Sequence, residues 1–94
     1  MSDPDIPDFS ALAGEGGGQE QLALDAIRAV VGWYTTQIVA EHRAAVPDQE
    51  RMEELKAARQ AALADQAQLA TADEEEAARV AAAYAARLKE LTKP

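Results

Sequence analysis

One long apolar segment, residues 22–40, constrains the fold of this chain most strongly. It reads LALDAIRAVVGWYTTQIVA, and at about 100° per residue its large hydrophobic side chains cover an arc of roughly 200° on a helix. A single neighbouring helix covers only about half of such an arc. We therefore predict that two partners pack on this helix, either two helices of the same chain or one of them and a second copy. In angular order the arc contains Leu22, Trp33, Val30, Tyr34, Ile27, Ile38, Val31 and Leu24.

Proline, glycine and capping residues divide the rest of the chain. Residues 1–18 contain two prolines and end in a run of three glycines, a composition that favours a disordered arm with a glycine linker. Pro47 favours the end of one helix before it and the start of another. Thr71 and Glu74 match a capping box at the start of a third helix. We predict helices over about 20–45, 47–70 and 72–91, in one domain that covers residues 19–94.

Short connections between helices imply antiparallel neighbours. The predicted fold is therefore all-α, a three-helix up-down-up bundle with a disordered N-terminal arm. The alternative is a weak break at Thr71, so that a helical hairpin forms an extended or swapped dimer. Alanine buries little area, and a chain of this size has a thin core. This favours a homo-oligomer, most simply a homodimer.

Charge and composition exclude several classes of protein. Five acids and no base in residues 1–20 give −5 of the formal net charge of −8, which leaves −3 on the rest. Direct nucleic-acid binding, which needs a basic footprint, is not expected. The acidic N-terminus does not resemble a secretory signal, and polar residues on one face of residues 22–40 argue against a membrane span. We expect a cytoplasmic protein, and the high alanine content together with six arginines against three lysines is associated with high-GC bacterial genomes.

The sequence contains no arrangement typical of catalysis or metal binding. There is no cysteine, and the single histidine, His42, has no serine or cysteine within a helical turn. The consecutive carboxylates of residues 73–76 point in different directions on a helix and cannot surround a cation. The glycines of residues 16–18 follow no strand and precede no lysine at phosphate-loop spacing. We expect no enzyme, no cofactor and no metal.

Two features point instead to binding. Arg59 and Gln66 interrupt an apolar stripe, and a hairpin about Pro47 would bring Arg59 level with Trp33 and Tyr34, where a guanidinium can stack on an aromatic ring. In the arm, apolar residues recur every three positions among acids, as in a segment that docks into an apolar groove. The alternative for the arm is a solubilising tail. The candidate interaction residues are Ile6, Phe9, Leu12, Val30, Trp33, Tyr34, Arg59 and Gln66.

The sequence thus favours a non-enzymatic protein–protein interaction module that self-associates through its first helix and carries a partner-docking acidic arm. Two alternatives stay open. One is a small antitoxin-like regulator or inhibitor of an enzyme or DNA-binding protein. The other is a structural component of a phage or mobile element.

Overall fold

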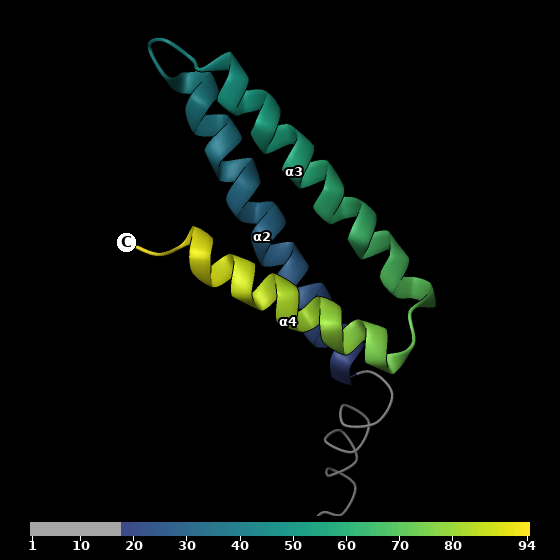
Figure 1. Ribbon diagram of the computed structural model, residues 1–94. Helices are drawn as coiled ribbons and strands as arrows, with labels where there is room; N and C mark the ends of the chain where they lie inside the picture. The colour runs from purple at the N-terminus through teal and green to yellow at the C-terminus, as the bar shows by residue number, and fades with distance from the viewer. Residues whose placement is uncertain (1–17) are drawn as a thin grey trace, which may run out of the picture.

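The computed structural model describes residues 18–94, and these form three α-helices (Figure 1). Helix α2 (Gly18–Arg43) is followed by α3 (Gln49–Gln68), a short 3₁₀ turn η2 (Leu69–Thr71) and α4 (Glu74–Leu91). The α3 helix returns beside α2, and α4 turns back and crosses α2 obliquely. The predicted all-α, up-down-up bundle is confirmed. Residues 1–17, most of the predicted arm, lie outside the described residues.

The central element is α2, because α3 and α4 both pack against it and make few contacts with each other. The prediction that two partners pack on this helix is therefore confirmed, and both belong to the same chain. The buried positions of α2 recur every three or four residues and so form one continuous stripe. They are Ala23, Ile27, Val30, Tyr34 and Ile38.

The core is as thin as the alanine content suggests. The largest fully buried side chains are Ile27, Met52 and Val30. Three other core positions, Ala23, Ala62 and Ala77, bury only a methyl group each. Because the hydrophobic contribution scales with the apolar area removed from water, this core stabilises less than one rich in leucine.

The N-terminal caps of α3 and α4 both differ in detail from the predicted helix starts. In α3 the cap is Asp48, whose carboxylate accepts the backbone N–H of Arg51 at 3.1 Å, and Pro47 lies before the cap rather than in the first turn. The side chain of Glu41 closes the hairpin, since it accepts the backbone N–H of Asp48 at 3.0 Å and pairs with Arg51 at 3.5 Å.

The predicted capping box at Thr71 is wrong. Thr71 belongs to η2, where its hydroxyl donates to the carbonyl of Gln68 at 3.4 Å. Asp73 caps α4 instead and accepts the backbone N–H of Glu76 at 2.8 Å. Aspartate is a somewhat better N-cap than threonine, and the two extra residues allow the chain to turn. The α2 helix also begins at Gly18, inside the predicted linker.

Candidate protein–protein interface

Within residues 18–94 the structure shows no group of three or more histidine or acidic side chains placed to hold a metal ion. His42 is exposed at the end of α2. None of the helices that the structure describes is long and apolar enough to cross a membrane. The described part of the chain has a cleft at one turn and partly exposed apolar surfaces beside the core.

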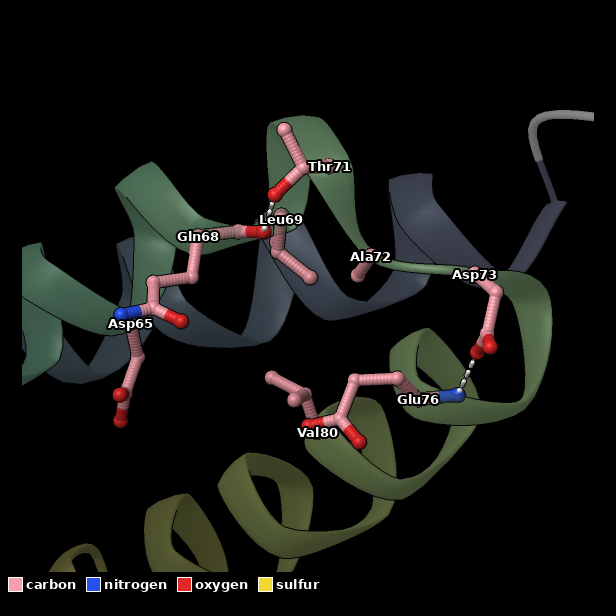
Figure 2. Close-up of a pocket in the computed structure, with 8 residues that line it drawn as sticks. All are labelled: Asp65, Gln68, Leu69, Thr71, Ala72, Asp73, Glu76 and Val80. Atoms are coloured by element: carbon pink, nitrogen blue, oxygen red, sulfur yellow. Dashed lines mark hydrogen bonds between the residues drawn. The ribbon is translucent and has the colours of Figure 1, made fainter.

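The cleft lies between the end of α3, η2 and the first turns of α4, and has a volume of about 370 Å³ (Figure 2). Three carboxylates line it, and each already has a partner. Asp65 accepts the hydroxyl of Tyr84, Asp73 caps α4, and Glu76 pairs with Arg79. Asp65 thus joins α3 to α4, whereas Asp73 and Glu76 act within α4, so each carboxylate of the cleft has a role in the fold.

A polar contact between α3 and α4 is centred on Tyr84. Its side chain is buried in the core, and its hydroxyl donates to Asp65 at 2.5 Å. The guanidinium of Arg87 lies 4.7 Å from the centre of the Tyr84 ring. Burial, and then the hydrogen bond to Asp65, raise the pKa of Tyr84 to about 12. The neutral phenol is therefore the form that the fold stabilises.

One edge of α2 carries apolar side chains that the core does not fully cover. Leu22 is 57% exposed, and Trp33, three turns later, is half-buried. The ring of Trp33 meets that of Tyr34 edge-on, with centroids 5.6 Å apart, and no acceptor within residues 18–94 bonds its indole N–H. No charged residue falls on this edge. We call it the Trp33 edge; it consists of Leu22, Ala26, Ala29, Trp33 and Ala40.

A second surface lies where α2 and α3 run side by side. Arg59 donates a hydrogen bond to the hydroxyl of Thr35 at 3.3 Å, so these two residues lie level with each other on the antiparallel helices. One turn further on, Val31 is therefore level with Leu63, which is 38% exposed. We call this surface the Leu63 face; it consists of Leu24, Val31, Thr35, Arg59, Leu63 and Gln66.

The Leu63 face points away from α4. Asp65, which bonds to Tyr84 of α4, is two residues from Leu63 and so about 200° away around α3. The basic side chains on and beside the face are Arg28, Lys56 and Arg59. None of these three forms a salt bridge with a carboxylate of residues 18–94.

The structure separates the predicted interaction residues. Val30 and Tyr34 lie in the core, whereas Trp33 lies on the Trp33 edge. Arg59 and Gln66 are half-buried on the Leu63 face. The other three, Ile6, Phe9 and Leu12, lie outside the described residues. What each residue binds stays a prediction.

The predicted stacking of Arg59 on an aromatic ring is replaced by its hydrogen bond to Thr35. Within the described residues the cation–π contact lies elsewhere, between Arg87 and Tyr84. Sequence reasoning missed this pair, although a separation of three residues on a helix is a usable signal. It could not have found Asp65, because only the packing of α3 beside α4 brings that carboxylate to Tyr84.

Comparison with models of protein families, with curated proteins and with solved structures finds no match.

Proposed function

We propose that this chain is a non-enzymatic, cytoplasmic protein–protein interaction module that forms a homodimer through α2. The observation that carries this proposal is the Trp33 edge, an uncharged strip in which Leu22 is 57% exposed beside a half-buried tryptophan. Tryptophan is among the residues that concentrate binding energy at interfaces. Its indole N–H also needs a partner once it is buried.

The spacing along the Trp33 edge suits helix pairing. Leu22, Ala26, Ala29 and Trp33 follow one another at intervals of four, three and four residues, the pattern of a coiled-coil seam. In an antiparallel pair of α2 helices, Leu22 of each copy lies opposite Trp33 of the other. Ala26 then lies opposite Ala29 of the second copy, so the contact is symmetric, as a two-fold dimer requires.

The central and the terminal side chains of this arrangement make different contributions to the contact. The alanines at the centre allow the two helices to approach closely, and the leucine–tryptophan pairs at the ends supply apolar area. Fully burying a leucine contributes about 1.5 to 3 kcal/mol. Leu22 still exposes 57% of its area, so each copy gains about 1 kcal/mol from Leu22 alone on pairing.

The test is Leu22→Glu, which places a charge on the Trp33 edge. The matched control is Val46→Glu, at a residue that is 85% exposed in the α2–α3 connection. Molar mass is measured by light scattering over a series of micromolar concentrations. We expect a dimer for the wild type and the control, and a monomer for Leu22→Glu. If Leu22→Glu has the same mass as the wild type, the contact does not include this edge.

A further inference from the structure

We propose that the acidic segment of residues 3–12 docks on the Leu63 face of its own chain. This inference does not rest on the homodimer, because it uses a different side of α2. The occupant is this segment because its apolar spacing, its charge and its point of attachment all match the face.

The apolar part of the face is partly exposed and so can contact a short segment. Leu24 and Val31 are half-buried, and Leu63 beside Val31 is 38% exposed. The α3 side of this surface points away from α4, as the bond from Tyr84 to Asp65 shows. Within residues 18–94, α2 and α3 thus form a two-helix surface with no third helix along it.

The charges on the two sides are complementary. Arg28, Lys56 and Arg59 line the face, and no carboxylate of residues 18–94 pairs with them. The segment carries Asp3, Asp5 and Asp8 and has no basic side chain. In a chain of net charge −8, three basic side chains that form no salt bridge within residues 18–94, beside an apolar patch, favour an acidic and apolar partner.

The attachment point makes docking on the same chain possible. The α2 helix begins at Gly18, and Leu24 lies about 9 Å further along its axis. The six residues from Leu12 to Gly18 can span about 20 Å, which suffices for a reversal and a return to Leu24. Three of the intervening residues are glycines, and these permit the tight turn that the reversal needs.

The spacing of the apolar residues in the segment also matches the spacing of the apolar residues on α2. Ile6 and Leu12 are six residues apart, which is about 9 Å in a helical segment. Leu24 and Val31 are seven residues apart on α2, or about 10.5 Å. With Leu12 at Leu24, Phe9 therefore lies near the level of Arg28, and Ile6 near Val31 and Leu63.

Disulfide trapping tests this arrangement in the full chain, which has no native cysteine. One double variant is Ser10→Cys with Ala67→Cys, where Ala67 is exposed one turn from Leu63. Its control is Ser10→Cys with Ala82→Cys, since Ala82 is exposed on α4. The rate of disulfide formation within one chain is followed by mass spectrometry. We expect the Ala67 pair to close at least about tenfold faster, because docking raises the effective concentration.

Single substitutions test whether docking of the segment causes the fast closure of the Ala67 pair. Phe9→Ala, or Arg28→Glu, should slow the Ala67 pair to the rate of the control pair, whereas Leu22→Glu should leave it unchanged. Equal rates for the two pairs would overturn the proposal, as would a fast Ala67 pair that Phe9→Ala does not slow. Disulfides formed mainly between chains would assign the face to the segment of a second copy and would also contradict docking on the same chain.

Discussion

The buried phenol of Tyr84 makes the stability of the fold depend on alkaline pH. The folded state raises the pKa of Tyr84 from 10.0 to about 12, first because the side chain is buried and then because its hydroxyl donates to Asp65. A group whose pKa is higher in the folded state contributes its full stabilisation below the unfolded pKa. This contribution is therefore complete below pH 10 and is lost as the pH rises towards 12.

The size of this pH effect on stability follows from the raised pKa of Tyr84. A difference of about two pKa units between the folded and unfolded states corresponds to about 2 to 3 kcal/mol. This is a large part of the roughly 5 to 15 kcal/mol that stabilises a typical domain. Tyr84→Phe keeps the ring under Arg87 but has no ionisable group. The difference in unfolding free energy between wild type and Tyr84→Phe should fall by about 2 to 3 kcal/mol from pH 9 to 12.

The measurement is urea denaturation followed by circular dichroism at several pH values between about 8 and 12. The two proteins share every other group that titrates in this range, so their difference isolates Tyr84. If the difference stays constant over the whole range, the phenol does not have a raised pKa. The contact between α3 and α4 would then differ from the one described here.

Four further substitutions test other parts of the fold, each by thermal or chemical denaturation. Gly32→Ala should raise the unfolding free energy by about 1 kcal/mol, because alanine favours the helix and the added methyl group meets no atom within 4 Å apart from its chain neighbours and the adjacent backbone of α2. A loss of stability would mean that this face of α2 is covered. Asp73→Ala should lower it by about 1 kcal/mol through loss of the α4 cap, and Thr71→Ala should change it much less. Ile27→Ala should lower it by about 2 to 5 kcal/mol, because the side chain is fully buried.

Much of the fold follows from periodicity. The apolar arc of residues 22–40 indicated a helix with two partners, and α3 and α4 are those partners. The arc alone could not say which of its members stay exposed. Leu22 lies at the edge of the arc and near the start of α2, so the two neighbouring helices leave more than half of it uncovered. Only the crossing of α4 over α2, which is a tertiary property, decides this.

The surfaces were less predictable than the helices. Arg59 and Gln66 were recognised because polar residues interrupted an apolar stripe. The hydrogen bond to Thr35 depends on the register of α2 and α3, which the Glu41, Asp48 and Arg51 contacts of the hairpin help to set. Leu63 belongs to the predicted apolar stripe, and it stays exposed because its side of α3 points away from α4, which contacts α3 at Asp65.

Dimerisation through the Trp33 edge is tested by recording molar mass and the emission of Trp33 in the same samples. Trp33 is the single tryptophan, so its fluorescence reports on the Trp33 edge alone. As the protein concentration rises, sedimentation equilibrium should show a monomer becoming a dimer. The emission of Trp33 should shift to shorter wavelength with the same midpoint, because pairing buries the indole. A monomer at every concentration would contradict dimerisation through α2, as would a dimer that forms without any change in Trp33 emission.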